Sequence, residues 1–116
     1  MYRPFINNVC LASEYTPAKS GRFGTAFLTL EAMGRKFGDP HVQDFSEDGV
    51  DGAGKVHAIW TIDTPRGIAE VRDYWWNPKD QLSIGADNKW AFLWAKNWLR
   101  CMGVRVSDSN GKEVRK

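Results

Sequence analysis

Tryptophan recurs at every fourth position near the C-terminal end of this chain, and that spacing strongly restricts the local structure. Trp90, Trp94 and Trp98 fall on one face of a helix together with apolar neighbours, while polar residues occupy the other face. The pattern predicts a helix from about Asp87, the expected N-cap, to Met102. Because the tryptophans share the apolar face, we expect Trp94 and Trp98 to lie in the core.

Two segments in the middle of the chain alternate between two sets of side chains with a period of two, which is typical of β-strands. They cover residues 55–64 and 67–76, and the connection between them contains Pro65 and ends in glycine. The pattern predicts an antiparallel hairpin. Trp75 and Trp76 are adjacent, so we expect them to point to opposite sides of the second strand, with one of them off the core face.

The region before the hairpin is less clearly patterned. Apolar residues spaced by four and three over residues 23–37 predict a helix with Ser20 as a candidate N-cap, although the run 27–30 also fits a strand. Shorter extended segments are expected around residues 5–11 and 81–84.

Together these elements predict an α+β domain in which two helices pack on one face of a small antiparallel sheet, in the approximate order β-α-β-β-α. Residues 104–106 would add a brief edge strand. The length of 116 residues is close to the commonest size of a single domain. We therefore expect one compact domain over residues 1–106, followed by a polar C-terminal tail over residues 107–116.

Charge is distributed unevenly along the chain, although the net charge is only +2. Residues 23–54 carry two basic and six acidic side chains, whereas residues 86–116 carry seven basic and three acidic ones. A molecule polarised in this way can be steered toward a charged partner.

The expected location is the cytoplasm. No apolar run approaches the roughly 20 residues that span a membrane, and the N-terminus lacks a signal-peptide pattern. The two cysteines, Cys10 and Cys101, are too few for a disulfide scaffold. We expect both to be buried thiols.

No catalytic set, metal-ligand set or phosphate loop is recognisable. Residues 44–49 resemble the first half of a calcium-binding loop, but the twelfth position, which should be a glutamate, is Lys55. His41 is expected to be an exposed loop residue, and His57 a surface or packing residue. We therefore expect a non-enzymatic protein without a metal and without a cofactor.

The hairpin is rich in charged side chains, which we expect to form cross-strand ion pairs on a solvent-exposed face. These side chains are Asp63, Arg66, Glu70, Arg72 and Asp73.

Three functions remain open. The first hypothesis is a protein-binding inhibitor, adaptor or accessory factor, a profile found among small proteins of phages and mobile elements. It follows from the absence of a catalytic set, the charge polarity and the surplus of aromatic residues. The expected contact residues are Arg66, Arg72, Tyr74, Trp76 and Lys79.

The second hypothesis is nucleic-acid binding through the basic C-terminal third, with an exposed tryptophan that stacks on bases. The expected contact residues are Lys89, Lys96, Arg100 and Arg105. The third hypothesis is a pocket for a small anionic ligand such as a nucleotide, formed between the hairpin and the last helix.

Overall fold

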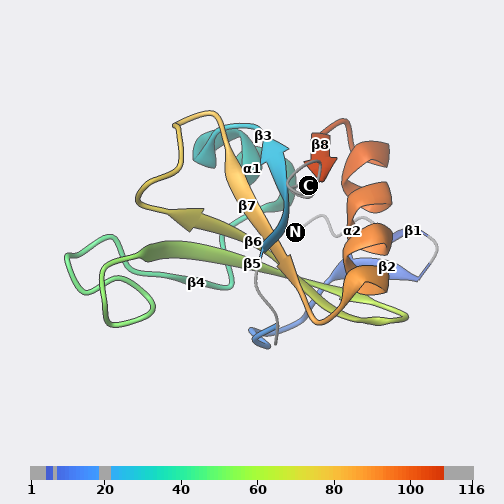
Figure 1. Ribbon diagram of the computed structural model, residues 1–116, viewed down its shortest axis with the longest axis horizontal. Coiled ribbons are helices and arrows are strands. Elements are labelled where there is room, and N and C mark those ends of the chain that lie inside the picture. Colours follow the sequence, from blue (N-terminus) through green and yellow to red (C-terminus); the bar gives the residue numbers. More distant parts are fainter. Residues whose placement is uncertain (1–4, 7, 19–21, 109–116) are drawn as a thin grey trace, which may run out of the picture.

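The computed structural model describes residues 5–6, 8–18 and 22–108. This part of the chain forms a curled antiparallel sheet and two helices, so the expected α+β class is confirmed (Figure 1). The strands follow the spatial order β1-β2-β5-β6-β7-β3-β8, and β4 also pairs with β5. The elements are β1 (Phe5–Ile6), β2 (Val9–Leu11), β3 (Arg22–Phe27), α1 (Leu30–Phe37), β4 (Val42–Gln43), β5 (Val56–Thr64), β6 (Gly67–Tyr74), β7 (Leu82–Ala86), α2 (Lys89–Cys101) and β8 (Arg105–Asp108).

The hairpin of β5 and β6 lies at the centre of the sheet and confirms the predicted hairpin. Its register pairs Thr64 with Gly67 at the turn and Trp60 with Val71 midway along the strands. The Thr64 hydroxyl donates to the carbonyl oxygen of Gly67 at 2.8 Å, which closes the turn. β7 then adds to the other edge of β6, where a short extended segment was expected.

The prediction of a helix over residues 23–37 is wrong for its first part, which forms the strand β3. β3 pairs with β7 on one side and with β8 on the other, and the helix α1 begins only at Leu30. The Thr29 hydroxyl caps α1 by accepting a hydrogen bond from the backbone N–H of Ala32 at 3.0 Å. Pairing on both strand edges satisfies the backbone over β3 and overrides a local pattern that fits a helix equally well.

The predicted order of elements was not confirmed, because the sheet contains more strands than expected. Residues 5–11 contribute two short strands, β1 and β2, and β8 extends the edge strand predicted at 104–106. β8 includes Ser107 and Asp108, which were assigned to the tail. The rest of the tail and the candidate cap Ser20 lie outside the described residues.

Both helices contribute to one hydrophobic core. Trp98 of α2 is only 1% exposed, and its ring centroid lies 5.1 Å from that of Phe37 in α1. The indole N–H of Trp60 in β5 donates to the carbonyl oxygen of Gly38 at 3.0 Å and ties the end of α1 to the sheet. Truncation of a buried aromatic ring typically costs about 3–5 kcal/mol, so these rings are major anchors of the fold.

Only part of the tryptophan stripe on α2 lies in this core. Trp98 is buried as expected and Trp94 is partly buried, but Trp90 is 60% exposed. The N-cap is Asn88 instead of Asp87, and the Asp87 carboxylate accepts a hydrogen bond from the backbone of β6. The apolar face of α2 is therefore narrower than its sequence indicated.

Neither helix of the described part has both the length and the hydropathy needed to cross a membrane. The prediction that both cysteines are buried is wrong. Cys10 is half-buried, whereas Cys101 is exposed at the last residue of α2.

Gly24 in β3 offers a direct test of how tightly the sheet packs against α2. A Cβ at this position would lie 2.5 Å from the backbone oxygen of Ser107 and 2.8 Å from the ring of Phe92. We expect Gly24→Ala to lower the free energy of unfolding by about 1–3 kcal/mol through overpacking. Urea unfolding followed by circular dichroism measures this loss.

Gly34→Ala is the matched control. Gly34 lies within α1, and a Cβ there would meet no atom within 4 Å. Because alanine is a better helix former than glycine, this variant should gain about 0.5–1 kcal/mol. Equal destabilisation by both variants would contradict the packing described for β3.

Candidate functional site

Two tryptophans are exposed where β6 ends. β6 stops at Tyr74, and the next residues turn away from the sheet, with the Asn77 N–H donating to the carbonyl oxygen of Tyr74 at 3.1 Å. Trp75 is 64% exposed and Trp76 is 51% exposed. The prediction that they point to opposite sides of a strand is therefore wrong, because the strand ends before it reaches them.

The rings at this end of β6 contact one another. Tyr74 and Trp76 stack with their centroids 4.5 Å apart and their planes at 16°, and Trp75 meets Trp76 edge-on at 5.8 Å. Such contacts stabilise ring pairs beyond the area they bury. The three rings therefore form one continuous apolar surface whose side chains hold one another in place.

The loop between β4 and β5 lies beside this surface. Phe45 is exposed and stacks on His57 with a centroid distance of 5.8 Å. The backbone N–H of Trp75 donates to the carbonyl oxygen of Lys55 at 2.9 Å, which fixes the two loops side by side at one end of the molecule (Figure 1). We call Phe45, Tyr74, Trp75 and Trp76 the aromatic end.

A hollow of about 430 Å³ opens beside the aromatic end. Its lining includes Trp75, Lys79, His57 and Asp73. Burial raises the pKa of Asp73, and the Glu31 carboxylate raises it further, while His57 acts in the opposite direction. Tyr74 lines the same hollow, so the expected contact residues Tyr74 and Lys79 lie around one hollow.

The loop of the aromatic end is acidic and internally ordered. The Asp44 carboxylate accepts hydrogen bonds from the hydroxyl and the backbone N–H of Ser46 at 2.6 and 2.9 Å, which lower its pKa. Desolvation would raise the pKa of Asp51, but hydrogen bonds from backbone N–H groups, including that of Ala53, outweigh it and lower the pKa. Both side chains therefore remain negatively charged at neutral pH.

Arg72, predicted to be an exposed contact residue, is instead buried beneath the aromatic end. Its side chain pairs with Glu70 at 2.6 Å and donates to the Tyr74 hydroxyl at 3.0 Å. Burial alone would lower the pKa of Arg72, but the hydrogen bond and charge of Glu70 raise it. The ion pair joins two residues of the same strand, so the expectation of exposed cross-strand pairs is wrong here.

The Arg72–Glu70 pair belongs to a polar face of the sheet. Gly85 of β7 leaves space for the guanidinium, since a Cβ there would lie 2.5 Å from Arg72 Cζ. The segment after β2 covers this face, and the Ala18 N–H donates to Glu70 at 2.8 Å. Burial also raises the pKa of the nearby Tyr15 hydroxyl. The buried polar side chains of this face are Thr25, Thr61, Glu70, Arg72 and Ser83.

Arg66 is not brought to the aromatic end. It lies in the turn between β5 and β6, whereas Tyr74 lies at the other end of β6. Eight residues of extended strand span roughly 26 Å. Arg66 instead accepts a hydrogen bond from the Asn88 side chain through its carbonyl oxygen, next to the start of α2.

His41 is not the exposed loop residue that the sequence indicated. It is half-buried, and its Nδ1 accepts a hydrogen bond from the Thr61 N–H at 2.9 Å, while its Nε2 lies 2.7 Å from the carbonyl oxygen of Ala12. An Nδ1 that accepts implies an Nε2 that donates, so the ring is the neutral Nε2–H tautomer. His41 joins the β2 segment to β5, a role that depends on contacts far apart in sequence.

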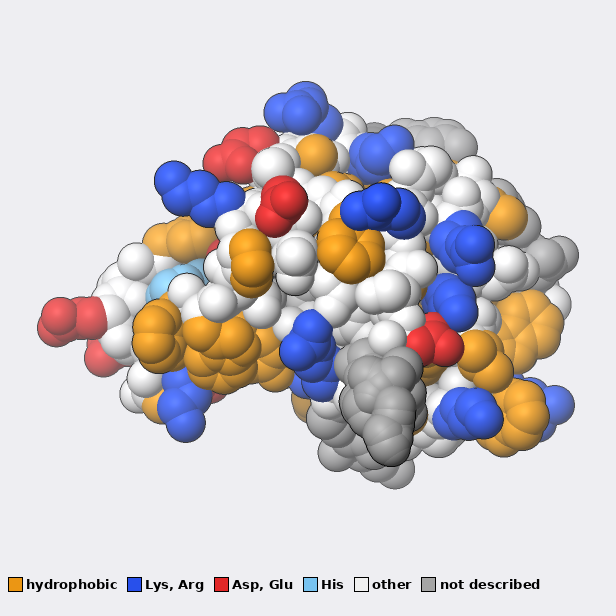
Figure 2. Space-filling model, turned by 45° about the horizontal axis from the view of Figure 1, so that its top comes forward, with side chains coloured by type: hydrophobic (Ala, Val, Ile, Leu, Met, Phe, Trp, Pro, Cys, Tyr) orange, Lys and Arg blue, Asp and Glu red, His pale blue; other side chains and the backbone are white. Residues whose placement is uncertain are grey.

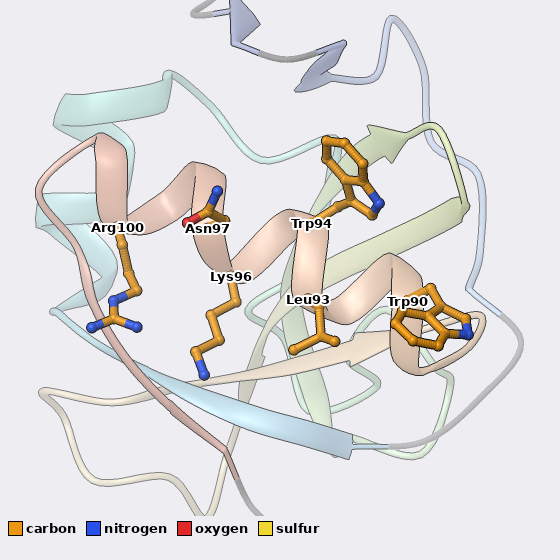
Figure 3. A pocket seen from close by; sticks show the side chains of 6 residues that line it. All are labelled: Trp90, Leu93, Trp94, Lys96, Asn97 and Arg100. Atoms are coloured by element: carbon orange, nitrogen blue, oxygen red, sulfur yellow. The ribbon is translucent and has the colours of Figure 1, made fainter.

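A second surface lies on the outer side of α2. A groove of about 380 Å³ runs along the helix, with the indole rings on its N-terminal half and Lys96 and Arg100 extending from it farther along (Figure 3). We call it the α2 groove. Its lining residues are Trp90, Leu93, Trp94, Lys96, Asn97 and Arg100.

The basic residues predicted to contact nucleic acid do not all reach this groove. Lys96 and Arg100 line it, and the Lys96 ammonium pairs with the Asp108 carboxylate at 2.8 Å. Lys89 is exposed at the start of α2. Arg105 lies on β8, with its guanidinium 4.6 Å from the centre of the Phe27 ring.

The space between the hairpin and α2, where a small anionic ligand was envisaged, is filled by side chains. Ala91, Ala95 and Trp98 of α2 are completely or almost completely buried against the sheet. Within the described residues, no three His, Cys, Asp or Glu side chains gather closely enough to hold a metal ion. A third hollow of the described part, of about 410 Å³, lies beside the segment after β2, and its lining includes Tyr15 and His41.

Comparison of the chain with protein-family models, with curated proteins and with solved structures found no match.

The Arg72–Glu70 pair should be essential for stability. Arg72→Met leaves the Glu70 carboxylate buried without its partner, and loss of one member of a buried pair typically costs about 3–5 kcal/mol. A double-mutant cycle with Glu70→Gln, measured by urea unfolding, tests this coupling. The double variant should lose less free energy of unfolding than the sum of the losses in the two single variants.

The exposed Lys96–Asp108 pair provides the control for this cycle. The Asp108 side chain is 47% exposed, so Lys96→Met should cost less than about 1 kcal/mol. Equal losses for Arg72→Met and Lys96→Met would show that Arg72 is not buried as described.

Asp73 should make stability depend on pH. Because its pKa is raised in the folded protein, the folded state binds the proton more tightly, and stability falls as pH rises from the unfolded-state pKa through the folded-state pKa. We therefore expect Asp73→Asn to raise the free energy of unfolding at neutral pH and to have no such effect below about pH 3.

Urea unfolding at both pH values measures this difference, with the exposed Asp80→Asn as the control for removal of one negative charge. A loss of stability in Asp73→Asn at neutral pH would instead mean that the ionised carboxylate is favourable in the folded state.

Proposed function

We propose that this chain is a small non-enzymatic binding module that recognises a protein partner through the aromatic end. The observation that carries the proposal is the pair of adjacent tryptophans, more than half exposed, that stack with Tyr74 at the end of a central strand. Tryptophan and tyrosine are the residue types most enriched among interface residues that dominate binding energy.

The arrangement of the rings favours recognition over accidental exposure. Tyr74 is held from below by the hydrogen bond from Arg72, and Trp76 stacks on Tyr74. A preorganised surface loses little conformational entropy when a partner binds. Large apolar rings that contribute nothing to a core, yet are fixed in position, are typical of an interaction site.

The charge around the aromatic end indicates the chemistry of the partner. Residues 44–55 and 73–80 carry six carboxylates and two lysines, and Figure 2 shows acidic side chains at the left-hand tip of the molecule. This balance repels nucleic acid and attracts a basic surface. Exposed indole rings also bind guanidinium and ammonium groups through cation–π contacts. The partner is a protein surface that presents arginine or lysine.

We further infer that binding occurs in the cytoplasm and serves an inhibitory or adaptor role. Neither cysteine is in a disulfide, which suits a reducing compartment. An adaptor or inhibitor needs a rigid contact surface and no catalytic set of its own.

Replacement of both exposed tryptophans tests the proposal. Nuclease-treated lysate is passed over the immobilised wild-type protein, the Trp75→Ser/Trp76→Ser variant and a matched Trp90→Ser variant. We expect a retained basic protein that the double variant loses and the Trp90→Ser variant keeps. Binding of that purified protein should weaken at least about tenfold in the double variant, since such residues typically contribute 2 kcal/mol or more.

Two outcomes would overturn the proposal. One is retention of the same proteins by the wild-type chain and by the double variant when both have native circular dichroism spectra. The other is self-association of the wild-type chain, measured by light scattering, that disappears in the double variant, because the aromatic end would then contact a second copy.

A further inference from the structure

We propose that the α2 groove is a separate binding site for single-stranded nucleic acid. It lies on α2 and is lined by no residue of the aromatic end. The proposal therefore goes beyond the protein-binding function and does not depend on it.

The groove presents positive charge and hydrogen-bond donors. Among the described residues, its polar lining consists of Lys96, Asn97 and Arg100 and includes no carboxylate. α2 itself contains no acidic residue between Lys89 and Cys101. Figure 2 shows that lysine and arginine side chains outnumber acidic ones on the right-hand half of the visible face, away from the acidic tip. Such a surface attracts phosphate groups.

The exposed rings of the groove supply the second requirement, a surface on which bases stack. Trp90 is 60% exposed and Trp94 is partly exposed one helical turn later, and both line the groove. Base–aromatic stacking requires unpaired bases whose faces are accessible. A duplex offers its phosphates to a basic helix but no base face to an indole ring, so the observations favour a single strand.

The spacing along α2 allows one strand to make phosphate contacts and base-stacking contacts at the same time. Trp90 and Arg100 are ten residues apart, which corresponds to about 15 Å along a helix. A strand lying along the groove would place its phosphates beside Lys96 and Arg100 and a base on Trp90. An acidic peptide would meet the same charges, but its Asp and Glu side chains carry no flat ring that could stack on Trp90.

The ion pair between Lys96 and Asp108 does not prevent phosphate binding. The side chains of Lys96 and Asp108 are 21% and 47% exposed, and ion pairs that solvent reaches contribute little stability. A phosphate oxygen can therefore replace the Asp108 carboxylate on the Lys96 ammonium. Arg100 is exposed and presents five N–H donors in a fork that matches phosphate geometry.

Fluorescence anisotropy with a labelled oligothymidylate of about 15 nucleotides tests the site. We expect binding at low salt, with log K falling against log [salt] with a slope of about −1.4, because each of two neutralised phosphates contributes about 0.7 for a single strand. Trp90→Ala should weaken binding at least about fivefold by removing one stacked base. Arg100→Gln should reduce the slope by about 0.7.

The Trp75→Ser/Trp76→Ser variant is the matched control and should bind the oligonucleotide like the wild type. This control separates the two proposals, since the protein partner would be lost in that variant alone. The inference is overturned by absence of binding at low salt, by binding that Trp90→Ala and Arg100→Gln leave unchanged, or by equal affinity for the corresponding duplex. Stronger binding of polyglutamate than of oligothymidylate would overturn it as well.

Discussion

The buried ion pair between Arg72 and Glu70 links the interior of the sheet to the surface that we propose to bind a partner. Two ionised groups are stable in such a place only when each is hydrogen-bonded and paired, and here Glu70 also accepts from the backbone of the covering segment. Arg72 in turn fixes the Tyr74 hydroxyl, on whose ring Trp76 stacks. The position of the exposed rings therefore depends on a charge balance several residues away inside the protein.

The parts of the fold that the sequence predicted well are those determined by local periodicity. The β5–β6 hairpin and α2 have unambiguous repeats of two and about four, and both are present. β3 was mistaken for a helix because its phenylalanines, Phe23 and Phe27, are four residues apart, which suits a helix as well as a strand. Its identity depends on β7 and β8, which approach from distant parts of the chain.

The candidate site was predictable only in its exposed members. Tyr74, Trp76 and Lys79 could be named because they belong to the predicted hairpin and its exit. Trp75 was left out because neighbouring residues of a strand were expected to point to opposite sides, with only one of the two tryptophans off the core face. Burial of Arg72 could not be foreseen, because it requires a neighbouring glycine on β7 and a covering segment from before β3. Such packing is a property of the assembled sheet and has no counterpart in the spacing along one strand.

The six tryptophans divide according to what they contribute to the fold, and this division supports two binding surfaces. Trp60 and Trp98 are buried and anchor the core, and Trp94 is partly buried against it. The exposed tryptophans are Trp75, Trp76 and Trp90. The exposed rings lie in surroundings of opposite charge, acidic around Trp76 and basic around Trp90. One partner cannot complement both surroundings equally well. The two proposals are therefore compatible in one chain, which would hold a basic protein at one end while α2 engages an anionic strand.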